Sequence, residues 1–122
     1  MPKEIEQKAM QLVMDFERRE GRKPKDVSRS GYGYDIESSG RFIEVKGMSH
    51  PTGGFISLYK KLFLKLGKKI ADYYIYVVFD IRNKPKLKII FPDKILENLE
   101  IETSFFIKAK AYRDVEVRDL VY

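Results

Sequence analysis

Hydrophobic and polar positions follow two different periods in the first half of the chain. From residue 3 to residue 19, apolar side chains recur at helical spacing with charged residues between them. This pattern predicts an amphipathic helix that stops near Gly21, followed by a polar loop or edge segment over residues 22–30. From residue 31 to residue 47 the period shortens to two on either side of Ser39-Gly40, which predicts a β-hairpin.

The second half predicts alternating helices and strands. Residues 48–54 contain Pro51 and a Gly53-Gly54 pair and should form a loop, and residues 55–58 a short strand. Helical spacing returns over residues 59–70, and the nearly continuous apolar run over residues 73–81 is typical of a strand buried on both faces. Residues 87–91 should form the next strand, Pro92 should begin a short helix, and residues 105–112 alternate like a strand with one solvated face. This order predicts an α/β fold with a central mixed β-sheet flanked by helices.

The predicted hairpin brings acidic residues together. With a two-residue turn, Asp35 lies opposite Glu44, and Glu37 lies opposite Phe42. Because side chains alternate between faces, one side should carry Asp35, Glu37, Glu44 and Lys46, and the other Tyr34, Ile36, Ile43 and Val45. Two carboxylates directly opposite each other have Cβ atoms about 5 Å apart, and their repulsion destabilises the sheet. A divalent cation would offset this repulsion, because Mg²⁺ accepts hard oxygen donors from acidic side chains.

These residues also resemble a known family. Asp35 followed by Glu44-Val45-Lys46 on the next strand resembles the core of the PD-(D/E)XK nuclease superfamily, which has the restriction-endonuclease-like fold. The fuller string, Gly-Tyr-Asp-Ile-x-Ser followed by Ile-Glu-Val-Lys-Gly, is similar to the domain at the C-terminus of the plant protein NO VEIN. That domain is widespread in bacteria and archaea beside restriction-system proteins. The local match covers residues 32–47, and the order of predicted elements from residue 4 to residue 80 agrees with it.

The resemblance implies a catalytic role for Asp35, Glu44 and Lys46. Asp35 and Glu44 would hold one or two Mg²⁺ ions, with Mn²⁺ as a substitute, helped by the backbone carbonyl of Val45. Lys46 would orient the attacking water or stabilise developing negative charge. A first-helix acid often supports the metal in this superfamily, and Glu6 is the candidate, with Glu4 as the alternative. The family often has an Asn-Glu pair at the start of the second helix, where this chain has Tyr59-Lys60-Lys61.

Three other polar or aromatic residues are weaker candidates. Glu37 could hold a second metal or pair with Lys46, although a structural use is favoured. His50 could shuttle a proton or touch a phosphate from its loop. Tyr32 is a loose candidate for base stacking, although packing is favoured there too.

Composition and charge point towards a polyanionic partner. The 122 residues make one domain, residues 1–122, and 24 Lys and Arg against 18 Asp and Glu give a formal charge of +6. There is no cysteine, so neither a disulfide framework nor a thiolate metal site can form. No signal peptide or apolar run of spanning length is present, so the protein is expected to be cytoplasmic and to have no membrane partner.

Basic residues gather in two segments of the sequence. The second predicted helix carries five lysines off its apolar stripe, and a shorter patch precedes the hairpin: Lys60, Lys61, Lys65, Lys68 and Lys69, then Arg22, Lys23 and Lys25. Such side chains can follow a nucleic-acid backbone as point charges on phosphate, and they can equally form a soluble face.

The sequence therefore predicts a small Mg²⁺-dependent endonuclease that hydrolyses phosphodiester bonds in DNA, with RNA left open. One alternative is a non-catalytic nucleic-acid-binding module with a vestigial nuclease site. Another is a structural subunit whose hairpin face packs on a partner. A chain of this size has no separate recognition domain, so a homodimer and a recognition or motor partner both remain open. Phe105 and Phe106 are the apolar residues that favour a dimer.

Overall fold

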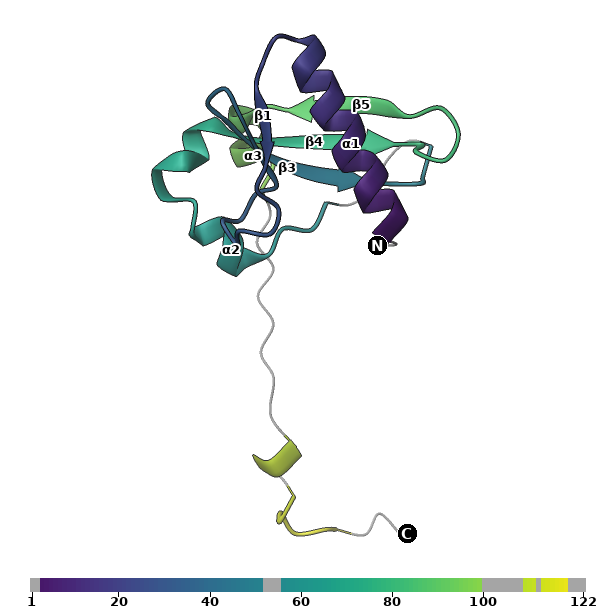
Figure 1. Cartoon of the computed structure of the whole chain (residues 1–122). Helices are drawn as coiled ribbons and strands as arrows, with labels where there is room; N and C mark the ends of the chain where they lie inside the picture. Colours follow the sequence, from purple (N-terminus) through teal and green to yellow (C-terminus); the bar gives the residue numbers. More distant parts are fainter. Residues whose placement is uncertain (1–2, 52–55, 100–108, 112, 119–122) are drawn as a thin grey trace.

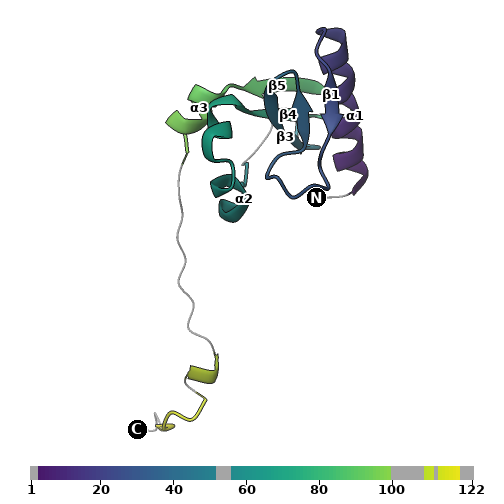
Figure 2. The same ribbon diagram turned by 60° about the vertical axis from the view of Figure 1, so that its left-hand side comes forward.

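The central feature of the fold is one mixed β-sheet with helices on both of its faces (Figures 1 and 2). The structure is a computed structural model that describes residues 3–51, 56–99, 109–111 and 113–118. Strands β1 (Pro24–Asp26), β2 (Ile36–Ser38), β3 (Arg41–Gly47), β4 (Tyr73–Phe79) and β5 (Lys86–Ile90) lie side by side in that order. Only β3 and β4 run parallel, and the segment between them crosses over one face of the sheet. The predicted α/β fold is confirmed.

Helix α1 (Lys3–Arg19) covers one face of the sheet, with the bounds predicted from its periodicity. Its buried residues Ile5, Ala9 and Val13 pack with Ile36 and Ile43 of the hairpin. A Cβ added to Gly47 would lie 2.9 Å from the Ala9 Cβ, closer than such atoms approach in real structures. The glycine after Lys46 therefore lets α1 pack directly against β3.

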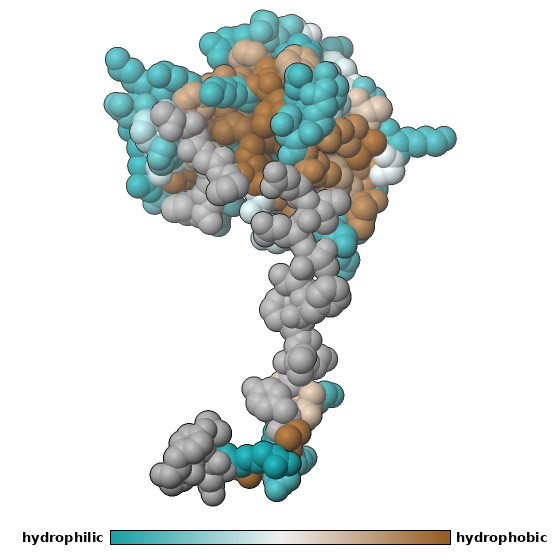
Figure 3. Space-filling model, turned by 180° about the vertical axis from the view of Figure 1, so that it is seen from behind, coloured by the Kyte–Doolittle hydropathy of each residue, from teal (hydrophilic) through white to brown (hydrophobic). Residues whose placement is uncertain are grey.

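The opposite face is covered by three short helical segments, α2 (Lys60–Leu64), the 3₁₀ helix η1 (Gly67–Asp72) and α3 (Pro92–Glu97). A second core cluster forms beneath them, and its buried members are Tyr34, Leu66, Tyr73, Ile75, Val77 and Ile95. Seen from behind in Figure 3, hydrophobic side chains on this side are framed by hydrophilic ones. Strand β4 lies between the two clusters and is buried on both faces, as its sequence predicts.

The hairpin has the predicted register, but its first strand is shorter than predicted. Ile36 pairs with Ile43 and Glu37 with Phe42 around the Ser39-Gly40 turn. The prediction for Tyr34 is wrong, because it packs in the second cluster with Phe42 and not on the face of Ile36. Gly33, at a φ of +94°, lies directly before it, so the backbone there departs from the alternation of an extended strand.

Three predicted elements differ in the structure. The helix expected over residues 59–70 is split, because Gly67 takes a φ of +54° at the first position of η1, and Tyr59 is exposed. Residues 56–58 of the expected strand 55–58 have no regular structure. Of the strand expected over residues 105–112, only residues 109–111 are described, and they form a 3₁₀ turn, η2 (Ala109–Ala111). Phe105 and Phe106 lie outside the described residues. No helix in the described part of the chain is long and apolar enough to cross a membrane.

Candidate metal and phosphodiester site

The acidic pair lies where the hairpin strands separate. Strand β2 begins only at Ile36, so the edge of β3 that faces β2 has no paired strand beyond Ile43. The Asp35 backbone N–H donates to the Ile43 carbonyl at 2.8 Å. The Asp35 Oδ2 accepts a hydrogen bond from the Val45 N–H, also at 2.8 Å. A carboxylate oxygen thus takes the place of a strand carbonyl, and this bond fixes Asp35 beside the open edge of β3.

The carboxyl groups of Asp35 and Glu44 are in hydrogen-bond contact across this edge. Burial, then the hydrogen bond and negative charge of Asp35, raise the pKa of Glu44 to about 9, although Lys46 opposes the shift. At neutral pH the pair therefore holds a proton that a single exposed carboxyl would have lost. This proton reduces the negative charge of the pair by one unit, and a bound cation would also reduce it.

A buried tyrosine lies beside Glu44. Tyr73, only 1% exposed, begins β4 and pairs with Phe42 of β3. Its hydroxyl lies near Glu44, and burial together with the two nearby acids raises the pKa of Tyr73. No sequence pattern signals that Tyr73 approaches Glu44, because Tyr73 is one aromatic residue in a run of apolar ones.

One cavity connects the acidic pair to α1. Its volume is about 680 Å³, and Asp35, Glu44, Val45 and Lys46 line it together with residues of α1. Residues from both faces of β3 contribute, because the strand edge is open there. The structure thus brings the three predicted catalytic residues and Val45 into a single cavity.

Glu6 of α1 also lines this cavity, as the first-helix prediction requires. Within the described residues, however, no group of three or more His, Cys, Asp or Glu side chains is arranged to hold a metal ion. Mg²⁺ is commonly held by one or two carboxylates together with water and substrate phosphates. The donor set of Asp35, Glu44 and the Val45 carbonyl fits that requirement, with Glu6 as an outer acid.

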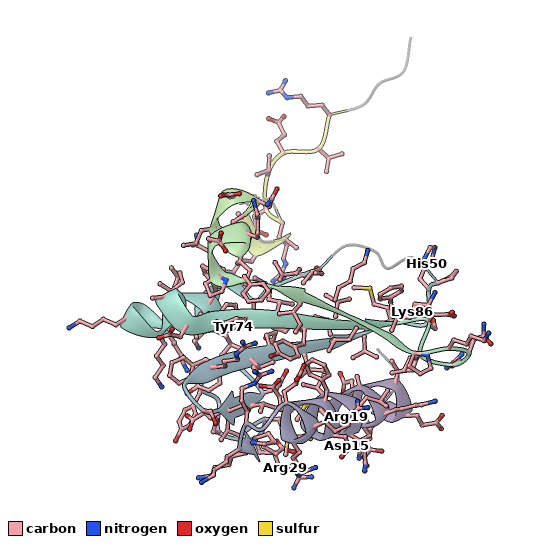
Figure 4. All side chains as sticks on the ribbon, turned by 90° about the horizontal axis from the view of Figure 1, so that it is seen from above. Asp15, Arg19, Arg29, His50, Tyr74 and Lys86 are labelled. Carbon is pink, nitrogen blue, oxygen red and sulfur yellow. The ribbon has the colours of Figure 1, made fainter. Side chains whose placement is uncertain are left out.

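Two weaker candidates have other surroundings. The Tyr34 hydroxyl donates to Glu37 Oε1 at 2.8 Å, so Glu37 has the structural use favoured above. The His50 carbonyl accepts a hydrogen bond from the Asp80 N–H at 2.9 Å. Figure 4 shows His50 well apart from Arg29, which lines the cavity.

The predicted basic residues divide into exposed and paired ones. The lysines of α2, η1 and their junction are all exposed: Lys60, Lys61, Lys65, Lys68 and Lys69. Lys69 also packs over aromatic rings, and its Nζ donates to the Tyr34 hydroxyl at 2.9 Å. Lys23 is exposed, whereas Arg22 forms two hydrogen bonds of 2.6 Å with Glu17. Two of the guanidinium nitrogens of Arg22 are therefore already engaged within the protein.

Two features near the hairpin were missed from the sequence. The end of β1 contributes Asp26 to the cavity and the loop after it Ser28 and Arg29, and the pairing of β1 with β2 brings them there. Glu17, which the helical pattern places on α1 without distinction, is fully buried beside Arg22 and Tyr76. The sequence signal that could have identified Glu17 is a charged residue at a core-facing position of the helix.

Comparison with known proteins identifies the family. The sequence model described as "Protein NO VEIN, C-terminal" matches residues 5–90. The match runs from the first turn of α1 to the last residue of β5, and so includes the whole sheet and the acidic site. The chain therefore belongs to the NO VEIN C-terminal domain family. Searches among curated proteins and among solved structures gave no match.

Proposed function

We propose that this protein is a metal-dependent endonuclease of the PD-(D/E)XK superfamily that hydrolyses phosphodiester bonds in DNA. The observation that carries the proposal is the Asp35–Glu44 pair, which shares one open cavity with Lys46. Two acids forced together at the edge of a sheet cost stability unless a cation joins them. A lysine on the same strand, two residues from the second acid, adds the positive charge that a phosphate would need.

Each residue has a defined task in this proposal. Asp35, Glu44 and the Val45 carbonyl would hold Mg²⁺ or Mn²⁺, and the bound ion would acidify a water and polarise the phosphate. The Val45 N–H holds the Asp35 carboxylate by a hydrogen bond, and the Tyr73 hydroxyl lies beside Glu44. Lys46 would hold the attacking water or stabilise charge on the phosphate oxygens. Glu6 would accept hydrogen bonds from waters at the α1 side of the cavity.

Charge supports a nucleic-acid substrate. The formal charge of +6 and the exposed lysines of α2 and η1 would attract a phosphate backbone without sequence preference. The alternative, a binding module without catalysis, would use the same lysines and needs no metal. It is favoured because, within the described residues, no group of three or more acidic, His or Cys side chains is arranged to hold a metal ion.

A cleavage assay separates these functions. Supercoiled, linear, single-stranded and branched DNA, and matched RNA, would be incubated with Mg²⁺ or Mn²⁺. We expect cleavage by the wild-type protein, at least a hundredfold loss in Lys46→Met, and normal activity in Lys86→Met. Lys86 is a suitable control because it is exposed on β5, at the other edge of the sheet from β1. DNA binding without cleavage of any substrate would contradict the nuclease and favour the binding module.

A further inference from the structure

A second cavity lies next to the acidic one, beneath the loop between β1 and β2. Its volume is about 520 Å³, within the range of pockets that hold small ligands. Asp26, Ser28 and Arg29 line both cavities, so the two are neighbours that share one wall. Lys25 and Tyr32 also line the second cavity.

Tyr32 offers an aromatic surface at this cavity. Its side chain is 49% exposed, although a tyrosine in this position was expected to pack. Its ring lies 5.7 Å from the ring of Tyr34, and the Lys69 Nζ is 5.1 Å from its centroid. The ring is therefore supported by the core through Tyr34, and half of its surface still faces solvent.

The loop that carries Tyr32 is held in place by its own hydrogen bonds. Asp26 Oδ1 accepts from both the N–H and the hydroxyl of Ser28, at 2.9 and 2.6 Å. The Ser30 hydroxyl donates to the Val27 carbonyl at 2.6 Å. The Val27 N–H donates to the carbonyl of Asp35 at 2.8 Å, which ties the loop to the acidic site. A loop ordered before binding loses less entropy when a ligand enters.

The charges around the second cavity suit a nucleotide. Lys25 and Arg29 are exposed cations at its wall, and Figure 4 shows the Arg29 side chain beside α1, near Asp15. The two acids at the same cavity are engaged, Asp26 by Ser28 and Glu37 by the Tyr34 hydroxyl. An exposed aromatic ring with flanking cations is the usual composition of a surface that binds single-stranded nucleic acid.

We propose that this cavity binds an unpaired base, which stacks on Tyr32 while Arg29 contacts the phosphate between it and the acidic site. The inference rests on the proposed nuclease function and specifies its substrate as single-stranded or branched DNA. A base paired within a duplex cannot present its face to Tyr32 without being unstacked, and unstacking costs a few kcal/mol. The loop thus selects strands whose bases are already unpaired.

Binding measured without metal tests the loop independently of catalysis. A fluorescent single-stranded oligonucleotide and its duplex would be titrated by anisotropy in EDTA with wild type, Tyr32→Ala, Tyr32→Phe and Tyr59→Ala. Stacking on one aromatic residue contributes about 1–3 kcal/mol, so Tyr32→Ala should weaken single-strand binding about tenfold. Duplex binding should change less than twofold. Tyr32→Phe should bind normally, and so should Tyr59→Ala, whose tyrosine is 77% exposed before α2.

Thermal unfolding of each variant would show that Tyr32→Ala remains folded. Equal weakening for single strand and duplex, or no change in Tyr32→Ala, would overturn the loop assignment. Tyr32-dependent selection of single strands by a protein that cleaves nothing with Mg²⁺ would overturn the proposed catalysis instead. The two failures are therefore distinguishable.

Discussion

Two glutamates near the same strands, the buried Glu17 and the half-buried Glu44, have opposite surroundings. Glu17 of α1 is fully buried, with Arg22 bonded to both of its carboxylate oxygens at 2.6 Å and the Tyr76 hydroxyl at 3.0 Å. Burial opposes its ionisation, but these hydrogen bonds outweigh burial and lower the pKa of Glu17. Glu44 faces a second carboxyl instead, and its pKa is raised. Glu17 is bonded to a cation, whereas Lys46 only partly offsets the effects of burial and of Asp35 on Glu44.

This difference separates a structural charge from one to which we assign a proposed function. The Glu17 network continues from Tyr76 to Arg41, whose guanidinium lies 4.5 Å from the Tyr74 ring, so it ties α1 to the sheet. The Asp35–Glu44 pair instead joins the two sides of one hairpin, where Asp35 also binds the Val45 N–H. A strained pair of acids at an open cavity is the arrangement expected where a protein gives up stability for binding.

The largest effect should come from removing the cation of the structural pair. Arg22→Ala leaves the fully buried Glu17 without its ion partner, and we expect the free energy of unfolding to fall by about 3 kcal/mol. Chemical denaturation measures this loss. Arg18→Ala is the matched control, because its pair with Asp15 is exposed, and it should cost less than about 0.5 kcal/mol. Equal losses in the two variants would show that the Glu17 pair is not structural.

The Asp35–Glu44 pair should make the protein less stable as pH rises, because the pKa of Glu44 is raised, whereas that of Glu17 is lowered. Folded Glu44 keeps its proton up to a pKa of about 9, whereas the unfolded chain loses it near 4.5, so the unfolded state binds fewer protons between these values. Stability in EDTA should therefore fall as pH rises from 6 to 8, by up to about 1.4 kcal/mol per pH unit for one such group. Glu44→Gln should flatten this slope and be more stable than wild type at pH 8. Parallel slopes for the two proteins in chemical denaturation would contradict the raised pKa.

Removing the hydroxyl from each of two buried tyrosines, one beside each glutamate, should have a smaller effect and should distinguish the two glutamates further. Tyr73→Phe removes only the hydroxyl beside Glu44 and should weaken Mn²⁺ binding about tenfold, as loss of such supporting groups commonly does. Tyr76→Phe removes the hydroxyl bonded to Glu17, and it should cost about 1 kcal/mol of stability while Mn²⁺ affinity stays within twofold. Calorimetric titration measures the Mn²⁺ affinity of each variant, and denaturation measures its free energy of unfolding. A similar loss of affinity in both would mean that Tyr73 acts through general stability.

Local patterns in the sequence were enough to predict the frame of the fold. Helix α1 and the central strand β4 follow from hydrophobic periodicity, and the Ser39-Gly40 turn fixes the register that places Asp35 beside Glu44. These patterns do not predict the backbone conformations of single glycines. Gly67 breaks the second helix, and Gly33 precedes the tyrosine that leaves its expected face.

The rest of the site depends on contacts between residues distant in sequence. Tyr73 reaches Glu44 only because β4 pairs in parallel with β3 at one register. Glu17 meets Tyr76 across 59 positions of the chain, and no period within α1 signals that contact. Arg29 enters the cavity through the pairing of β1 with β2. Sequence patterns thus identified the acidic pair, and the residues around it required the structure.

Titration of the protein with Mn²⁺ by calorimetry at pH 8 tests most directly whether the Asp35–Glu44 pair is a metal site. We expect saturable binding to the wild-type protein with release of protons, because the Glu44 proton must leave before a cation can enter. Asp35→Asn should abolish the binding, and Asp93→Asn, which alters an exposed acid on α3, should retain it. Undiminished Mn²⁺ binding in Asp35→Asn, or no saturable binding to the wild type, would contradict the account.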